Sequence, residues 1–175
     1  MLRTLFVLSL AVAGTLAQTG QDRFTLKSPN GIAFSEFRGY DTWQDVAVSQ
    51  TDDGIKVIVA NPAMMKAYND GAPENGKPFP DGSMIAKIEW TKEQNPASPY
   101  AVTVPGTLKS VAFIEKDSKR FADTNGWGYA QLLHDPKTNT FKPYGDNATF
   151  GKTVCHACHT TVKDRDYIFT AHPKR

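Results

Sequence analysis

The chain has 175 residues, of which 40% are hydrophobic and 22% charged, so its composition is that of one globular domain and excludes a disordered tail. Lysine and arginine total 20 against 18 acidic residues, which gives a formal net charge of +2. A dedicated nucleic-acid binder carries a strong basic excess clustered on one face, so this balance argues against nucleic acid as a partner.

The chain begins with a pattern typical of a secretory signal peptide. Arg3 precedes a short apolar run at residues 5–13, and Thr15-Leu16-Ala17 is an acceptable peptidase site. The run is shorter than the ~20 residues of a membrane-spanning helix, and a buried N-terminal helix is the alternative. We therefore expect a signal peptide over residues 1–17 and a single domain over residues 18–175. The domain is expected in the periplasm, with no membrane partner.

The next segments predict a flexible lead-in followed by antiparallel strands. Residues 19–29 are polar and read as the lead-in. Residues 43–48 and 55–59 flank Thr51-Asp52-Asp53-Gly54, whose Asp-Gly pair is typical of a hairpin turn. Residues 84–90 alternate with the period of a strand. This period places Met84, Ala86, Ile88 and Trp90 on one face, and Ile85, Lys87 and Glu89 on the other.

The remaining elements complete a mainly β (α+β) domain. Residues 111–115 and 127–133 are further strand candidates, and a turn at 135–139 leads into Phe141. Residues 61–71 predict a helix, because Asn61 can cap it, Pro62 suits its first turn and Gly71 ends it. A short helix is expected to precede or carry the cysteine motif. The predicted fold is an antiparallel β-sheet domain with a few helices.

Both cysteines of the chain fall in Cys155-His156-Ala157-Cys158-His159. Cys-x-x-Cys-His is the attachment pattern of a c-type haem. Two thiols must reach two vinyl groups on one porphyrin edge, while the adjacent His159 places a ring nitrogen on the iron. We therefore predict one covalently bound haem c near the C-terminus, held by Cys155 and Cys158 with His159 as the metal ligand.

Two other uses of the cysteines compete with haem. A structural zinc site could combine Cys155, Cys158 and His159 with His134 or His172. Such sites usually join two ligand couples of similar spacing, and the second couple is missing here. A thioredoxin-like redox pair would follow a strand early in a βαβ unit, whereas this pair lies near the C-terminus.

The ligand on the other side of the iron is the next question, since an electron carrier needs a second strong ligand, usually Met or His. Met64 and Met65 lie in the predicted helix and Met84 on a strand face, where methionine usually packs in the core. His134 and His172 lie beside a turn and near the chain end. None of these residues stands out, which favours an open, five-coordinate iron.

The sequence resembles the cytochrome P-460 family over nearly the whole mature chain. The matching pieces are Asn61-Pro62 with its Met-rich helix, residues 76–90, Gly126-Trp127-Gly128, the motif at 155–159 and residues 163–170. The resemblance implies a mainly antiparallel β fold, a homodimer and a five-coordinate haem c. It also implies oxidation of hydroxylamine, or binding and conversion of nitric oxide, with electrons passing to an exported cytochrome.

The resemblance also assigns residues. A lysine of the family is bonded covalently to the porphyrin rim, and Lys87 matches it, with Lys77 as the alternative. Taken alone, Lys87 reads as an exposed mid-strand lysine; the bond needs a neutral amine, which burial beside a haem would favour.

A distal carboxylate handles protons in members that oxidise hydroxylamine. Asp146 is the candidate between Asp135 and Cys155, although a loop aspartate is an ordinary turn residue. Arg38 and Phe79 are further pocket candidates. The rival functions are a non-catalytic cytochrome of the c-prime-beta type, which binds nitric oxide or carbon monoxide, and a simple electron carrier.

Overall fold

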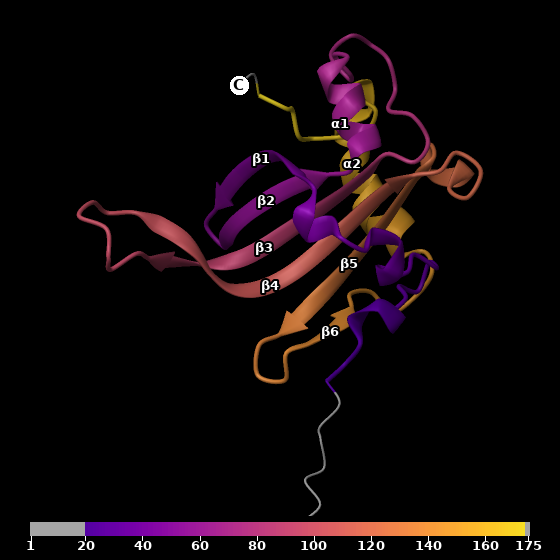
Figure 1. Ribbon diagram of the computed structural model, residues 1–175. Helices are drawn as coiled ribbons and strands as arrows, with labels where there is room; N and C mark the ends of the chain where they lie inside the picture. The colour runs from indigo at the N-terminus through magenta and orange to yellow at the C-terminus, as the bar shows by residue number, and fades with distance from the viewer. Residues whose placement is uncertain (1–19, 174–175) are drawn as a thin grey trace, which may run out of the picture.

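The computed structural model describes residues 20–173, and its centre is one antiparallel sheet in the order β1-β2-β3-β4-β5-β6 (Figure 1). The strands are β1 (Gln44–Thr51), β2 (Gly54–Ala60), β3 (Met84–Gln94), β4 (Thr103–Lys116), β5 (Trp127–Asp135) and β6 (Thr140–Pro143). The predicted mainly β fold is therefore confirmed. The predicted signal peptide, residues 1–17, lies outside the described residues.

Strand β4 is much longer than the five residues predicted for it. Its first half contains Pro105 and Gly106, two residue types that disfavour strand interiors. Pro105 nevertheless pairs with Lys92 of β3. The pairing forms a long hairpin that projects beyond the other strands (Figure 1). Pairing between the two strands therefore outweighs the local preference.

Helix α1 (Pro62–Asn69) begins and ends as predicted. The Asn61 side chain accepts a hydrogen bond from the Met64 amide at 3.0 Å, which caps the helix. The same oxygen accepts from the Met84 amide at 3.1 Å, so Asn61 also joins the helix to β3. Gly71, with φ of 97°, adopts the left-handed conformation that ends many helices.

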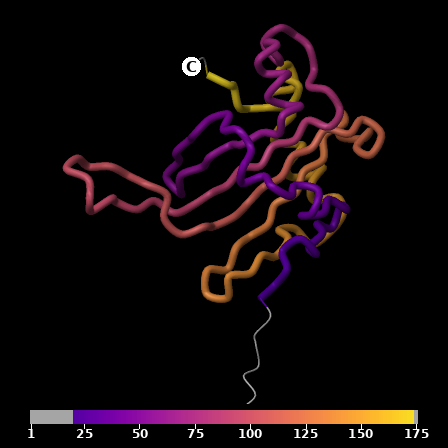
Figure 2. Tube along the Cα trace, in the orientation of Figure 1, coloured from indigo at the N-terminus to yellow at the C-terminus, as the bar shows by residue number. Residues whose placement is uncertain are grey.

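The cysteine motif lies on a helical segment near the C-terminus. A π-helix (Gly151–His156) continues into the short α2 (Ala157–His159) and a 3-10 segment (Thr160–Arg165). The chain then runs beside α1 (Figure 2), where the Tyr68 hydroxyl donates to the Thr170 carbonyl at 2.9 Å. None of the helices in the described part of the chain is long and apolar enough to cross a membrane.

The two faces of the sheet support separate hydrophobic clusters. The alternation predicted for β3 is confirmed, because Ile85 packs in one cluster and Ala86 in the other. The cluster of Ile85 also contains α1 residues and Trp127, and the cluster of Ala86 contains Phe34, Phe37 and Phe113. Lys87 lies two residues after Ile85 on β3 and therefore shares its face of the sheet, which is the side of the C-terminal helices.

The prediction of a flexible lead-in over residues 19–29 is wrong for its described part. A 3-10 helix (Arg23–Thr25) forms there, and Phe24 and Leu26 pack against the cluster of Ala86. Further 3-10 helices (Phe34–Phe37 and Tyr40–Thr42) cover the same face. The C-terminal helices occupy the other face of the sheet. The segment is ordered because the burial of Phe24 and Leu26 outweighs its polar composition.

A buried carboxylate links this N-terminal layer to β4. Glu115 is 4% exposed and accepts a hydrogen bond from the Arg120 guanidinium at 2.7 Å. Arg120 also donates to Glu36 and to the Gly31 carbonyl. Burial and the negative charge of Glu36 raise the pKa of Glu115 to about 7, although Arg120 opposes the rise.

This raised pKa predicts that the contribution of Glu115 to stability falls as the pH rises from about 4.5 to about 7. In that window the folded state holds a proton on Glu115 that the unfolded chain has released, so this group lowers the free energy of unfolding as the pH rises. The loss is up to about 3 kcal/mol, at about 1.4 kcal/mol for each pH unit by which the pKa moves. Glu115→Gln should therefore gain stability over the wild type at pH 8 but not at pH 4.5, measured by denaturant unfolding. An equal effect at both pH values would contradict this.

Candidate functional site

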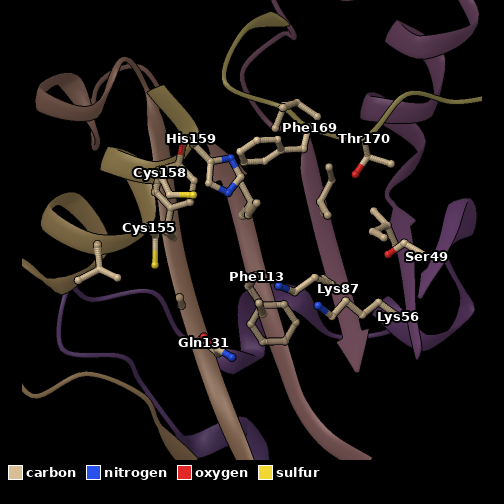
Figure 3. A pocket seen from close by; sticks show the side chains of 18 residues that line it. Ser49, Lys56, Lys87, Phe113, Gln131, Cys155, Cys158, His159, Phe169 and Thr170 are labelled. Carbon is tan, nitrogen blue, oxygen red and sulfur yellow. The ribbon is translucent and has the colours of Figure 1, made fainter. Parts of the chain in front are cut away.

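A cavity of about 400 Å³ lies between the sheet and the cysteine-bearing helices. Cys155, Cys158 and His159 form one wall, and Lys56 and Lys87 point into the space from the sheet on the opposite side (Figure 3). The volume falls in the range of small-molecule sites. The structure therefore brings four of the five predicted site residues to one cavity.

The position of the cysteine helix depends on a close approach to the sheet at Gly151. A Cβ atom at Gly151 would lie 2.8 Å from the Asn30 side chain and 3.0 Å from the Tyr129 carbonyl. Glycine therefore allows the helix to start directly against β5. The spacing of the motif then presents the two thiols and the imidazole within about one helical turn.

The two cysteines are free thiols with different surroundings. Cys155 is half-buried against the core, and Cys158 is exposed. Burial raises the pKa of the Cys155 thiol. No group of three or more His, Cys, Asp or Glu side chains in the described part of the chain could hold a metal ion. His134 instead forms hydrogen bonds with the Leu108 carbonyl and the Asn139 side chain, and His172 with the Val46 carbonyl. Neither histidine therefore completes the zinc site considered above.

His159 is oriented by a hydrogen bond to the backbone. Its Nδ1 lies 2.6 Å from the Tyr167 carbonyl oxygen, and because a carbonyl only accepts, Nδ1 carries the proton. The Nε2 atom is then left with its lone pair. The ring is held between Tyr129 and Phe169, each with its centroid 4.8 Å away. A histidine ligand with one nitrogen so fixed is typical of metal coordination.

Lys87 is placed by the register of four strands. It pairs with Ile58 of β2 and with Ala112 of β4, which in turn pairs with Gln131 of β5. The side chain is half-buried, and it forms no hydrogen bond or ion pair with any described residue. Burial, and then the positive charge of Lys56, lower the pKa of Lys87. The cavity therefore shifts the protonation equilibrium of Lys87 toward the neutral, nucleophilic amine.

Lys56 is a charged residue of the cavity that was not predicted from the sequence. It lies two positions before Ile58 on β2 and therefore shares the face of Lys87. Its ammonium lies 4.0 Å from the Glu89 carboxylate. The alternation of residues 55–59 predicts that Lys56 and Ile58 share one face of a strand. Only the pairing of β2 with β3 shows that this face lines the cavity.

The other candidate residues lie elsewhere. Asp146 is exposed in the loop after β6, accepts a hydrogen bond from the Asn147 side chain and does not line the cavity. Lys77 is also exposed. The Arg38 guanidinium lies 3.8 Å from the Phe24 ring centroid, on the opposite face of the sheet. Phe79 is buried against Tyr68 and Trp127. Each of these is satisfied by local packing or solvent.

The lining of the cavity fits the haem that the cysteine motif predicts. Its walls are largely apolar, with Ile58, Ile85 and Ile114 on the sheet, as a porphyrin requires. No methionine is among the described lining residues, and Met64 and Met65 of α1 are buried in the core. The donor set is therefore one imidazole and two thiols on one wall and two amines on the other.

These features define a mainly β protein with a candidate haem pocket between its sheet and a C-terminal helix. The family model of Cytochrome P460 matches residues 37–170, which include the whole sheet and the cysteine motif. The chain belongs to the cytochrome P460 family, and haem is the cofactor that membership implies. A comparison with curated proteins found no match.

Proposed function

We propose that this chain is an exported c-type cytochrome that oxidises hydroxylamine, and binds or converts nitric oxide, at a five-coordinate haem. The observation that carries the proposal is the half-buried, unpaired Lys87 amine facing the wall of Cys155 and His159 (Figure 3). An ordinary surface lysine would be largely exposed or paired. The location in the periplasm, the homodimer and an exported electron-accepting cytochrome are proposed with it, on the resemblance.

In this proposal each residue has a separate task. Cys155 and Cys158 hold the cofactor through thioether bonds, His159 Nε2 ligates its iron, and Lys87 is bonded to the porphyrin rim. When bound, the haem supplies a redox-active iron with one open position for a small nitrogen-oxygen substrate. The apolar walls of the cavity would limit the access of water to the bound group, and the Gln131 amide and the Lys56 ammonium are hydrogen-bond donors in the same cavity.

A second candidate function is a gas-binding cytochrome without turnover, similar to the c-prime-beta type. The observation that favours it is the absence of a carboxylate among the described residues that line the cavity. Oxidation of hydroxylamine releases protons, which a positioned carboxylate can accept as a general base. Asp146 would need to move from its exposed loop to take that role.

The absorption spectrum of the purified, dithionite-reduced protein tests the first proposal. We expect a broad, red-shifted Soret band, together with steady consumption of hydroxylamine when an electron acceptor is present. A conventional c-type Soret band with nitric oxide binding but no turnover would establish the second candidate instead. A six-coordinate, low-spin spectrum of the resting protein would indicate an electron carrier.

A further inference from the structure

The turn that follows the cysteine helices has an unusual backbone. Asp166 and Tyr167 are consecutive left-handed residues, with φ of 48° and 63°. Asp adopts this conformation more readily than most residues, whereas a bulky side chain such as Tyr rarely does. Such a conformation persists only where the surrounding contacts hold it, and it is frequent at functional sites.

Asp166 is held by a buried ion pair. Its carboxylate accepts two hydrogen bonds from Lys116 Nζ, at 2.9 and 3.2 Å. It also accepts from the Phe79 amide at 2.8 Å and from Trp127 Nε1 at 3.3 Å. The side chains of Lys116 and Asp166 are 8% and 12% exposed, so water competes little for either charge. The carboxylate therefore ties the turn to β4, to β5 and to the loop before β3.

The Lys116 side of the ion pair is also held by further contacts. Its ammonium also donates to the Asn125 carbonyl at 3.2 Å and lies 4.6 Å from the Trp127 ring. The ion pair therefore joins two groups that are each fixed by further contacts. Such an ion pair restricts the movement of the backbone at the turn of Asp166 and Tyr167.

The residue fixed by this turn is the one that contacts the candidate iron ligand. The Tyr167 carbonyl is the acceptor for His159 Nδ1 at 2.6 Å. On its other side the chain is anchored by Ile168, which is 1% exposed. The Tyr167 ring packs against His156, with centroids 4.9 Å apart. Asp166 and Ile168 thus bracket the carbonyl that orients His159.

We propose that the Asp166–Lys116 ion pair is a positioning device for His159, which sets how strongly the imidazole binds iron. The inference rests on the proposed haem function. A short hydrogen bond from Nδ1–H to a carbonyl raises the basicity of the ligating nitrogen. A more basic ligand stabilises the ferric state, so the pair lowers the reduction potential of the haem.

The test uses Asp166→Asn in the full-length holoprotein. Asparagine keeps the size and the tolerance of the left-handed conformation, but it removes the charge and one acceptor oxygen. We expect covalent haem to be retained, the iron–histidine stretching band of the ferrous protein to move to lower frequency, and the midpoint potential to rise. Glu74→Gln is the matched control, since it removes the exposed Arg165–Glu74 pair one residue before the turn. It should change neither quantity.

Asp166→Asn leaves the Lys116 ammonium buried without its partner, and this variant could fail to fold for that reason alone. A second variant keeps the inference testable in that event. Asp166→Asn with Lys116→Gln replaces the pair by two neutral amides, which avoids that unpaired charge. An unchanged stretching frequency and potential in either folded variant, with only a lower melting temperature, would overturn the inference and leave the pair a structural contact. A wild-type protein without haem would overturn the proposed function as well.

Discussion

Replacing Lys87 with methionine should abolish hydroxylamine oxidation and leave a covalently bound haem with a conventional c-type Soret band. Methionine has a similar length and fits an apolar cavity, but it has no nucleophilic nitrogen. The half-buried Lys87 amine has no partner among the described residues. Burial lowers the pKa of Lys87, which means that the folded state disfavours the charged amine. Its removal should therefore raise the stability of the haem-free protein at neutral pH. Spectrum, turnover and unfolding are measured on the same preparation.

Two lysine variants serve as controls for this result. Lys77→Met alters the exposed loop lysine and should leave both spectrum and turnover unchanged. Lys56→Met removes the charge that helps to lower the pKa of Lys87, so the pKa of Lys87 rises and less neutral amine is present at a given pH. The modified spectrum should then require a higher pH during maturation. If Lys87→Met kept both the red-shifted band and turnover, the role given to Lys87 would be wrong.

The double variant Cys155→Ser with Cys158→Ser should lose all covalently retained haem, as measured by haem staining after denaturing electrophoresis. A serine hydroxyl cannot form the thioether, so no bond survives denaturation. Each single variant should retain haem through one bond. The sheet should still form, because Cys158 is exposed and Cys155 only borders the core.

His156→Gln is the matched control within the motif. His156 is buried and does not line the cavity, and its ring forms hydrogen bonds with the Tyr129 hydroxyl and with Asn125. Covalent haem should therefore be retained in this variant. Haem that remained bound after denaturation of the double cysteine variant would contradict the attachment site, and stoichiometric zinc in the wild type would favour the alternative chemistry.

The local elements of this protein were determined by the sequence itself. The hairpin of β1 and β2, the Asn61 cap of α1 and the alternation of β3 each depend on residues a few positions apart. The same holds for the cysteine motif, whose thiols and imidazole lie within about one turn of helix. Short-range sterics and hydrogen bonds decide such features, so they can be predicted without the rest of the chain.

The site as a whole was decided only by the tertiary structure. The register of β2, β3 and β4 brings Lys87 to face Cys155 and adds Lys56 to the cavity, while Asp146 stays on an exposed loop. The same packing buries Phe24 on the far face and carries the Tyr167 carbonyl to His159. These contacts depend on which strands pair and on which face each segment buries its apolar side chains. That choice is made by the packing of the whole domain, and no short stretch of sequence contains it.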